Sequence, residues 1–541
     1  MPTLPPQFPA RRPTSKTDAW PSLEQLGFWN IAEREPDRSA LVLPDGSTWT
    51  FGEVRREANR LAHGLRALGL KPGDSIATLL PNDTHAYTTR LAAFQTGLYI
   101  TPLNHHLTGQ EIAYVLGDAE ARVLIADERF ADTARRALAE SGTIDSAHCL
   151  SIGEIEGFSE LAELTRNQPD GDPPERCAGQ LMLYTSGTTG RPKGVRRPLP
   201  SEDPSDWAAQ RAIFARAFGL RPFDGSQLVV GPLYHAGPSV FSWGSLDAGH
   251  QQIVTDRFDP EETLRLIETH RVTNTHLVAT MFHRLLALPA AVRAGYDVSS
   301  LRMVAHSAAP TPIELKRQMM DWWGPIIWET YGGTEGAATI CKPHHWLAKP
   351  GTVGRPVRDA RITILDEEDK PCRPGTPGRI FVEREGPKME YWKDPEKTRE
   401  IHRGNALTLG DIGYVDEDGF LFLTGRASEA IITGGVNVYP AEVENALMEH
   451  PEVVDLAVIG APDDEWGERI VGIVQPRTLP ETDSEKQALS DELLAFARER
   501  LAGFKCPREI HFRSELPREE NGKLYRRRLR EAFWQDSNRS I

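Results

Sequence analysis

The sequence predicts an α/β fold in which largely parallel strands alternate with helices. Short apolar runs at residues 75–81, 121–128 and 227–234 are separated by longer amphipathic stretches. The clearest helix starts at Thr50: apolar residues recur every three or four positions as far as Leu68, and Gly69 and Pro72 end the pattern. Further runs at 180–187, 274–280 and 301–307 continue the alternation, which is typical of a parallel sheet covered by helices.

The pattern changes near residue 360, where strand-like runs alternate with Asp, Gly and Pro turns. Residues 416–419 (DEDG) lie between two β-rich runs and predict a hairpin. After Arg426, Pro440 opens a helix in a short α+β stretch. We therefore expect a loosely ordered segment 1–20, a large N-terminal domain 21–426 with two parallel-type sheets and a small β-barrel-like section, and a small mobile C-terminal domain 427–541.

Composition narrows the class of function. Lys and Arg number 62 against 77 Asp and Glu, which gives a formal net charge of -15. This charge argues against broad binding of nucleic acid or anionic membranes. No stretch approaches the ~18 uninterrupted apolar residues of a membrane span. The five cysteines are scattered and form no CxxC pair, which favours a reducing, cytoplasmic setting; Cys341 and His344 lack the second ligand pair of a structural zinc site.

The segment YTSGTTGRPKG, residues 184–194, is typical of an anion-binding loop. Its residues 185–190 are all Thr, Ser or Gly, so that no bulky side chain blocks the approach of a phosphate to the backbone. Lys193 adds a compact positive charge. The loop is not a Walker A motif, because Lys193 stands between Pro192 and Gly194. Taken alone, the segment also fits a flexible linker.

Three further stretches carry chemistry-bearing residues. In WETYGGTEG (328–336), Tyr331 can stack on a base and Glu335 is a plausible oxygen ligand for Mg²⁺. Asp411 and Arg426 flank the predicted hairpin, and a carboxylate is the usual partner of ribose hydroxyls. In EENGK (519–523), an Asn-Gly turn would present Lys523 at its tip. Each stretch also has a structural interpretation. Residues 328–336 fit a strand that ends in a turn, Asp411 fits an ordinary turn residue, and the arginines at 526–528 fit a solvated basic tail.

In this order, the four stretches resemble the adenylate-forming superfamily of acyl-CoA synthetases, luciferases and adenylation domains, and most closely its acyl-CoA synthetase branch. The resemblance extends from about Trp20 to Arg530 and includes LTGRASEAIITGGVNVYPAEVE (423–444) and DDEWGERIVG (463–472). It implies that ATP activates a carboxylic acid as an acyl-adenylate, which CoA then converts to a thioester after a rotation of the C-terminal domain. ATP/AMP, Mg²⁺ and coenzyme A are the implied cofactors.

The resemblance also assigns candidate site residues. The implied catalytic residues are Lys523, Glu335 as Mg²⁺ ligand, Thr334 and His235. Implied to bind the nucleotide are Thr185, Ser186, Gly187, Thr188, Thr189, Lys193, Ser307, Ala308, Ala309, Pro310, Tyr331, Asp411 and Arg426. On the CoA side it implies Gly434, Gly435, Val436 and Asn437.

The same resemblance places the acyl pocket among small and aromatic residues, namely Tyr234, His235, Val240, Phe241, Trp243, Met281, Phe282, Gly332, Gly333 and Ala337. Small residues leave room and the aromatic residues supply apolar surface, which favours a bulky apolar or aromatic acid. The alternative is that these side chains only fill the core. Amino-acid-adenylating relatives carry Asp at the position of His235, so His235 argues against an α-amino acid.

One departure from the family concerns the hinge. Ser428 stands where the family usually has Asp or Lys, which leaves the balance between the two half-reactions open. A ligase that only thioesterifies a supplied acyl-adenylate, an adenylating enzyme that loads a separate carrier protein, and a luciferase-like oxygenase are the alternatives. A non-catalytic binding protein would need damaged motifs, and these motifs are intact. The expected partners are a small carboxylic acid and CoA, without nucleic acid; a homodimer and an upstream enzyme or carrier protein stay open.

Overall fold

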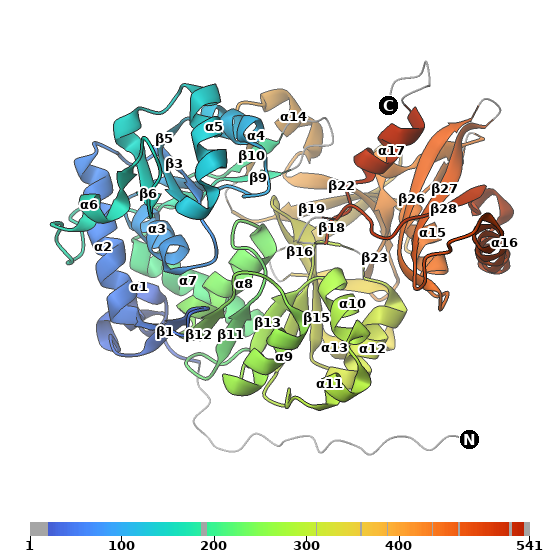
Figure 1. Cartoon of the computed structure of the whole chain (residues 1–541), viewed down its shortest axis with the longest axis horizontal. Coiled ribbons are helices and arrows are strands. Elements are labelled where there is room, and N and C mark those ends of the chain that lie inside the picture. The colour runs from blue at the N-terminus through green and yellow to red at the C-terminus, as the bar shows by residue number, and fades with distance from the viewer. Residues whose placement is uncertain are drawn as a thin grey trace.

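The computed structural model describes residues 20–185, 192–309, 311–357, 360–386, 388–434, 436–463, 466–518 and 522–534. Apart from Trp20, the segment 1–20 that was expected to be loosely ordered lies outside these residues. A large α/β body and a smaller C-terminal unit make up the molecule (Figure 1), which confirms the predicted fold class. Among the described helices, none is both long and apolar enough to cross a bilayer.

A large mixed sheet forms the centre of the body. Its parallel part has the order β1-β12-β11-β13-β14-β15 and continues through β16 and β17 into antiparallel strands, with β2 at the opposite edge. The section expected to be barrel-like is therefore joined edge to edge with the parallel sheet. The strands are β1 Ser39–Val42, β2 Thr48–Thr50, β11 Ser226–Val229, β12 Gln251–Val254, β13 Asn274–Leu277, β14 Met303–His306, β15 Ile327–Gly333, β16 Gly336–Cys341, β17 Thr352–Pro356, β18 Ala360–Leu365, β19 Gly378–Arg384, β21 His402–Arg403, β22 Ala406–Val415 and β23 Leu421–Arg426.

A second sheet of the body is wholly parallel, with the order β7-β6-β5-β3-β4-β8. Its strands are β3 Ser75–Leu79, β4 Tyr99–Pro102, β5 Ala121–Asp127, β6 Cys149–Ile152, β7 Ser159–Glu160 and β8 Gln180–Leu181. A small antiparallel sheet with the order β20-β10-β9 comprises β9 Leu183–Thr185, β10 Lys193–Arg196 and β20 Glu390–Tyr391. The parallel pairing agrees with the alternation predicted from the sequence.

Helices cover the sheets of the body. They are α1 Phe28–Arg34, α2 Phe51–Ala67, α3 Thr84–Gln95, α4 Gly109–Asp118, α5 Ala131–Ser141, α6 Leu161–Thr165, α7 Pro204–Ala217, α8 Ala236–Asp247, α9 Pro260–Thr269, α10 Ala279–Ala287, α11 Ala290–Ala294, α12 Ile313–Trp323, α13 Pro343–Ala348 and α14 Pro395–Ile401. The predicted helix after Thr50 is α2. It begins with a capping box, in which Thr50 and Glu53 each bond the other's backbone N–H.

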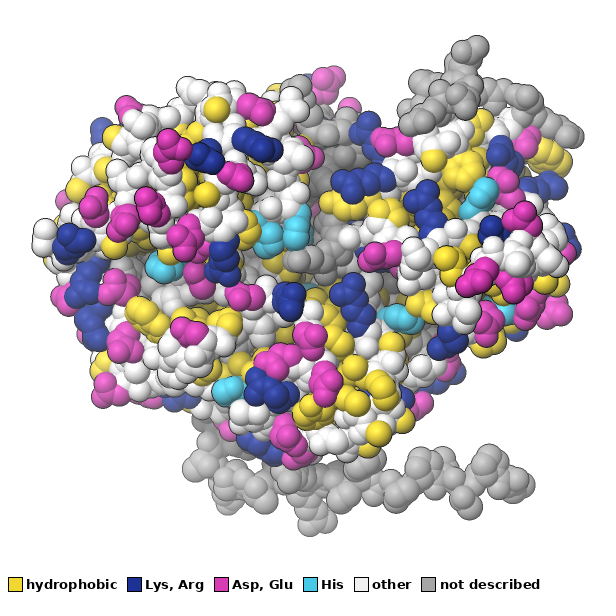
Figure 2. Space-filling model, in the orientation of Figure 1, with side chains coloured by type: hydrophobic (Ala, Val, Ile, Leu, Met, Phe, Trp, Pro, Cys, Tyr) yellow, Lys and Arg dark blue, Asp and Glu magenta, His cyan; other side chains and the backbone are white. Residues whose placement is uncertain are grey.

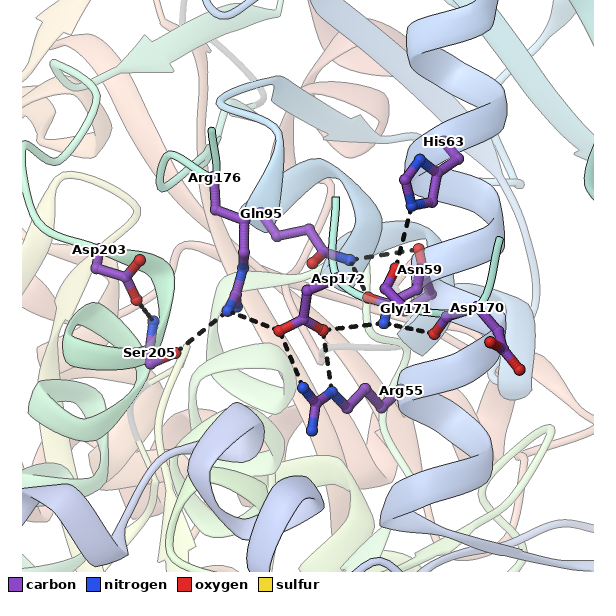
Figure 3. Close-up of polar contacts among 11 residues, drawn as sticks. Arg55, Asn59, His63, Gln95, Asp170, Gly171, Asp172, Arg176, Asp203 and Ser205 are labelled. Atoms are coloured by element: carbon purple, nitrogen blue, oxygen red, sulfur yellow. Dashed lines mark hydrogen bonds and ion pairs between the residues drawn. The ribbon is translucent and has the colours of Figure 1, made fainter. Parts of the chain in front are cut away.

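A polar network fastens the segment before β8 to α2 (Figure 3). Asp172 accepts hydrogen bonds from Arg55 of α2, at 3.0 and 2.9 Å, and from Asn59 at 3.0 Å. Arg176 also contacts Asp172, at 3.2 Å, and its guanidinium carbon lies 4.6 Å from the centre of the Trp29 ring. The network fixes the path of the chain as it enters β8 and β9.

In its described residues, the C-terminal unit consists of a sheet and the helices α15, α16 and α17. Its strands are β24 Ile431–Thr433, β25 Val436–Val438, β26 Val453–Asp463, β27 Gly467–Pro476 and β28 Glu509–Phe512, and its helices are α15 Pro440–Leu447, α16 Asp483–Arg500 and α17 Arg526–Trp534. Its core includes Val443 and Leu447 of α15 packed with residues of β26 and β27. This agrees with the predicted helix after Pro440.

Arg526 corrects the interpretation of residues 526–528 as a solvated tail. Its guanidinium pairs with both carboxylate oxygens of Glu444 and, at 3.0 Å, with Glu429. Two carboxylates converge on one partly buried cation, which a charge pattern along the sequence does not reveal. Arg527 and Arg528 are exposed, as that interpretation expected.

Candidate functional site

A cleft of 4160 Å³ separates the large body from the C-terminal unit, and Figure 2 shows the hollow between them. Its floor is formed where parallel strands of the large sheet end: His235 follows β11, Ser307 follows β14, and Thr334 follows β15. The carboxyl ends of parallel strands meet at one edge of a sheet, where α/β proteins bind ligands. The cleft therefore brings together side chains that are up to 100 positions apart in this part of the sequence.

At one end of the cleft, Asp411 is held by two side chains. The hydroxyl group of Tyr331 donates to Asp411 Oδ2 at 2.8 Å, and Arg426 Nε donates to Oδ1 at 2.8 Å. Asp411 on β22 and Arg426 on β23 face each other in the antiparallel register. The pair thus offers a carboxylate and a guanidinium side by side, and the bond to Asp411 fixes the orientation of the Tyr331 ring.

Glu335 lies in the turn between β15 and β16 and faces the cleft. Its Oε1 accepts a hydrogen bond from the hydroxyl group of Tyr391 at 2.9 Å. Arg197 Nη2 donates to the backbone carbonyls of Thr334 at 2.9 Å and Glu335 at 2.7 Å. A Cβ at Gly333 would lie 2.4 Å from Glu335 Oε2, so a larger residue there would displace the Glu335 carboxylate. The sequence analysis missed Tyr391 and Arg197, although Arg197 stands only four residues after Lys193.

Lys193 begins β10, opposite Thr185 on β9, and both residues line the cleft. The Lys193 ammonium lies 3.2 Å from Asp394 Oδ2 and 5.5 Å from the centre of the Tyr391 ring. The two strands flank the predicted anion-binding loop, whose members Ser186, Gly187, Thr188 and Thr189 lie outside the described residues. Lys193 is nevertheless placed beside the Glu335–Tyr391 pair.

The segment after β14 also lines the cleft, through Ser307, Ala308 and Ala309. Ala308 has φ of 77°, a left-handed conformation that costs free energy for a residue other than glycine. Such outliers gather at functional sites. Pro310, the last member of the predicted adenine-flanking loop, lies outside the described residues.

Lys523 reaches the cleft from the C-terminal unit. The turn that carries it packs on the body, since a Cβ at the preceding Gly522 would lie 3.1 Å from Thr280 Oγ1 at the start of α10. Burial and the positive charge of Lys523 lower the pKa of His235 to about 4. At neutral pH, His235 is therefore an uncharged imidazole beside an ammonium group, at the N-terminus of α8.

Most of the residues predicted for the acyl pocket line the cleft, namely Tyr234, His235, Val240, Phe241, Met281, Gly332, Gly333 and Ala337. Trp243 and Phe282 are not among the described residues that line it. Trp243 packs against Tyr87, with ring centres 5.3 Å apart, and Phe282 against His306, at 5.4 Å. Both are buried because they face inward from α8 and α10, so the assignment of these two residues to the pocket wall is corrected.

His276, at the end of β13, is a wall residue that the sequence analysis missed. Its ring stacks on Phe241 with centres 4.9 Å apart, and its Nε2 is hydrogen-bonded to Ser307 Oγ at 2.8 Å. Burial lowers the pKa of His276 to about 3, so that the ring is neutral. The side of Gly237 that faces this pair leaves no space for a Cβ, which would lie 2.9 Å from His276 Cε1.

The hairpin of β24 and β25 lies elsewhere. Gly434, Val436 and Asn437 are exposed and are not among the described residues that line the cleft; Gly435 lies outside the described residues. Ser428 is exposed in the short turn Ala427–Glu429 at the junction of the two bodies and lines the cleft. The C-terminal unit thus presents Lys523 to the cleft and the hairpin to solvent.

Two family models match the chain. The model described as AMP-binding enzyme matches residues 28–392, and the model described as AMP-binding enzyme C-terminal domain matches residues 442–523. The first model alone spans more than half of the chain. The boundary between the two matches includes the turn Ala427–Glu429.

Similar proteins cover nearly the whole chain. A feruloyl-CoA synthase of Amycolatopsis sp is 34% identical over 517 residues, 94% of this chain and 99% of its own length. A fatty acid–[acyl-carrier-protein] ligase, ScoC of Streptomyces coeruleorubidus, is 31% identical and covers 94% of this chain and 96% of its own length. Among solved structures, the anthranilate CoA ligase AuaEII in complex with anthranoyl-AMP has a TM-score of 0.81 at 26% identity, covering 94% of this chain and 97% of its own.

Proposed function

Since this chain belongs to the AMP-binding enzyme family, in its acyl-CoA synthetase branch, we propose that its acid substrate is a bulky apolar or aromatic carboxylic acid. The enzyme is an ATP-dependent acyl-CoA synthetase. In the proposed reaction, ATP first converts the acid to an acyl-adenylate, and CoA then takes the acyl group. The observation that carries the proposal is the convergence of Lys523, Glu335 and the Asp411–Arg426 pair on one cleft.

The first half-reaction brings two anions together. A carboxylate oxygen of the acid attacks the α-phosphorus of ATP, and the bond from that phosphorus to the pyrophosphate oxygen breaks. We assign to Lys523 the neutralisation of charge on both reactants as they approach, since its ammonium reaches the cleft next to His235. The uncharged state of His235 suits a residue that orients the acid by a hydrogen bond without adding a second fixed charge.

The residues of the β15–β16 turn fit a divalent cation. Glu335 presents a carboxylate to the cleft, one oxygen of which is oriented by Tyr391, and a carboxylate combined with phosphate oxygens is a typical environment of Mg²⁺. We propose that Glu335 holds this ion; when bound, it supplies neutralisation of phosphate charge. Arg197 and Tyr391 act as positioning residues, because they fix the backbone and the carboxylate of Glu335 respectively.

For the nucleotide, we propose three groups of contacts. Asp411 and Arg426 bind the ribose hydroxyls, since together they offer acceptors and donors to vicinal hydroxyl groups. Tyr331, fixed by its bond to Asp411, stacks on adenine beside the strained segment at Ala308. Thr185 and Lys193, with the loop between them, bind the β- and γ-phosphates, and Thr334 the α-phosphate. This arrangement assigns each end of ATP to a separate wall of the cleft.

The second half-reaction needs a different face of the C-terminal unit. CoA thiolate attacks the acyl carbonyl, and AMP leaves. We propose that the C-terminal unit rotates about Ser428 so that the hairpin of β24 and β25 replaces Lys523 at the cleft. The exposure of Val436 and Asn437 and the place of Ser428 at the junction support this proposal.

The residues that line the proposed acyl pocket indicate the class of acid. Gly332, Gly333 and Ala337 leave space beside the apolar surface of Val240 and Phe241. Such a pocket accommodates a bulky apolar or aromatic group better than acetate. The relative named feruloyl-CoA synthase is consistent with an aromatic acid. We expect the reaction to take place in the cytoplasm, where ATP and CoA are both available.

A carrier protein is the second candidate acceptor, because the relative ScoC is named a fatty acid–[acyl-carrier-protein] ligase. The two acceptors share the pantetheine thiol, so the same exposed hairpin would serve both. CoA and a pantetheinylated carrier protein, offered at equal concentration, separate them by the mass of the thioester formed.

The proposed substrate class is tested with a panel of acids that runs from acetate to long-chain, aryl and arylpropenoic acids. ATP–pyrophosphate exchange reports adenylation, and mass spectrometry reports acyl-CoA. We expect exchange and acyl-CoA formation with at least one large acid at a kcat/KM well above that of acetate. Turnover of acetate above every large acid would contradict the proposal. Thioester formation from added adenylate without exchange would support the alternative of a thioesterification-only ligase.

A further inference from the structure

The cleft is also lined by helix α8 and by two arginines, of which Arg90 is buried and Arg211 is partly buried. Its lining passes from His235 and Ala236 at the start of α8 to Val240 and Phe241, and includes Arg90 of α3 and Arg211 of α7. Arg90 contacts α8 directly, since Arg90 Nη1 donates to Ser239 Oγ at 2.5 Å. His235 and Ser239 are one helical turn apart, which is ~6 Å along the helix.

Arg90 is almost completely enclosed by protein. Arg90 is only 7% exposed. Its guanidinium carbon lies 4.3 Å from the centre of the Trp243 ring and 4.9 Å from the centre of the Phe94 ring. Arg90 Nε is buried and has no hydrogen-bond partner among the described residues. Arg90 Nη2 also has no hydrogen-bond partner among them, but it is not one of the buried atoms. Since Arg90 lines the cleft, Nη2 is the atom that a ligand in the cleft can reach.

The charges around Arg90 are not balanced. Arg211 Nε bonds Asp247 Oδ2 at 2.8 Å, and the other oxygen of Asp247 accepts from the backbone N–H of Phe28 at 3.0 Å. Burial and the positive charge of Arg211 lower the pKa of Arg90, while Asp247 opposes them. A guanidinium keeps its proton in proteins, so two cations share the one carboxylate of Asp247. A buried cation without a full counter-charge is costly unless an anion joins it.

We infer that Arg90 binds a second carboxylate of the acid substrate, at the end opposite the carboxyl group that is activated. This inference rests on the proposed function and narrows its substrate class to dicarboxylic acids with an apolar middle. Val240, Phe241 and Phe214 supply apolar surface to the same cleft. The spacing along α8 suits an aromatic ring or an aliphatic segment of comparable length. A carboxylate supplies the missing counter-charge, and Arg211 Nη2 adds a second donor nearby, since both guanidinium groups lie over the Phe94 ring.

The test compares matched acids. The two acids of a pair share one carbon skeleton, and only one of them carries a distal carboxylate. One series of pairs is straight-chain and the other is aromatic. The rate of pyrophosphate release gives kcat/KM for each acid. For at least one skeleton we expect the wild-type enzyme to prefer the dicarboxylic member by roughly 10-fold or more, the discrimination expected of a charged hydrogen bond. Arg90→Met should abolish or reverse this preference and improve turnover of the monocarboxylic member. Arg90→Lys, which keeps the charge and guards against misfolding, should retain part of the preference.

Arg216→Met is the matched control, because it removes an exposed guanidinium that lines the same cleft from the same helix as Arg211; it should leave the preference unchanged. Two results would overturn the inference: a wild-type preference for the monocarboxylic acid in every pair, or an equal loss for both members in Arg90→Met, which is the signature of a purely structural arginine. In both cases acyl-CoA still forms and the proposed function stands. If no acid of either kind gives acyl-CoA, the proposed function itself fails and this inference with it.

Discussion

The C-terminal unit presents two unlike surfaces. Lys523 is directed into the cleft and acts electrostatically on His235. The hairpin of β24 and β25 points to solvent, with Val436 45% exposed and Trp466 beside it 41% exposed. One rigid unit cannot hold both surfaces at the same cleft. This difference supports our proposal that the described arrangement serves the adenylation half of the reaction and that the other surface takes part after a rotation.

The largest effect is expected when the positive charge of Lys523, on the surface that faces the cleft, is removed. Lys523→Ala should lower adenylation, measured by ATP–pyrophosphate exchange, by roughly 10²–10³-fold, the typical cost of one charge-stabilising donor. Thioester formation from a preformed acyl-adenylate should largely survive. An equal loss in both assays would contradict the assignment of Lys523 to the first half-reaction.

The second test changes the solvent-exposed side. Gly434 has φ of 57°, and a Cβ there would lie 2.6 Å from Trp466 Cε3. Gly434→Val should therefore distort the hairpin and lower thioester formation from added adenylate by about 10-fold, while exchange stays near wild type. Gly419→Val is the control, since Gly419 has φ of 80° in a turn where a Cβ meets nothing within 4 Å. If Gly434→Val lowered ATP–pyrophosphate exchange while Gly419→Val did not, the proposed division of the two half-reactions between the two surfaces would be wrong.

A smaller effect is expected at Tyr391, which lines the cleft beside Glu335. Tyr391→Phe removes the hydroxyl group that donates to Glu335 Oε1 and keeps the ring beside Lys193. The apparent Mg²⁺ requirement of exchange should rise about 10-fold, a typical cost of losing a group that orients a metal ligand. Tyr414→Phe, a tyrosine stacked on Phe422 at 5.0 Å, serves as control. An unchanged Mg²⁺ titration would remove Tyr391 from the positioning role.

The smallest expected effect measures the closeness of Lys523 to His235. Removing the ammonium in Lys523→Met removes a repulsion on the protonated imidazole, so the pKa of His235 should rise from about 4 by about one unit. It should stay below 6.5, because burial is the larger cause. NMR titration of the labelled histidine measures it. Lys505→Met, whose ammonium pairs with Glu442 at 2.6 Å, should not move it. A fixed pKa in Lys523→Met would show that the two groups do not meet in solution.

Local patterns were sufficient to predict much of the fold and of the site. The helix after Thr50 forms with both parts of its capping box, and the hairpin at 416–419 joins β22 and β23. Lys523, Glu335 and Asp411 were named by the family resemblance of short motifs, and all three line the cleft. Trp243 and Phe282 were misassigned because periodicity places a residue on a helix but does not say which face of that helix meets the cleft.

Residues that act through distant partners were not predictable. Tyr391 contacts Glu335 across 56 positions and Arg526 contacts Glu444 across 82. Lys316, fully buried and 2.6 Å from Glu329, is a third such case. Each of these partners is an ordinary polar residue in its local sequence, and only the packing of separate elements gives it a function.

By itself, the sequence determined the alternation of strands and helices and the motifs proposed to bind phosphate, because those depend on residue type and spacing over short distances. Only the tertiary structure decided which surface of the C-terminal unit faces the cleft, which side chains orient Glu335, and that Arg90 is enclosed beside Arg211 with a single carboxylate between them. The physical reason is that charge balance and burial belong to elements packed together in space, and the chain order does not contain them.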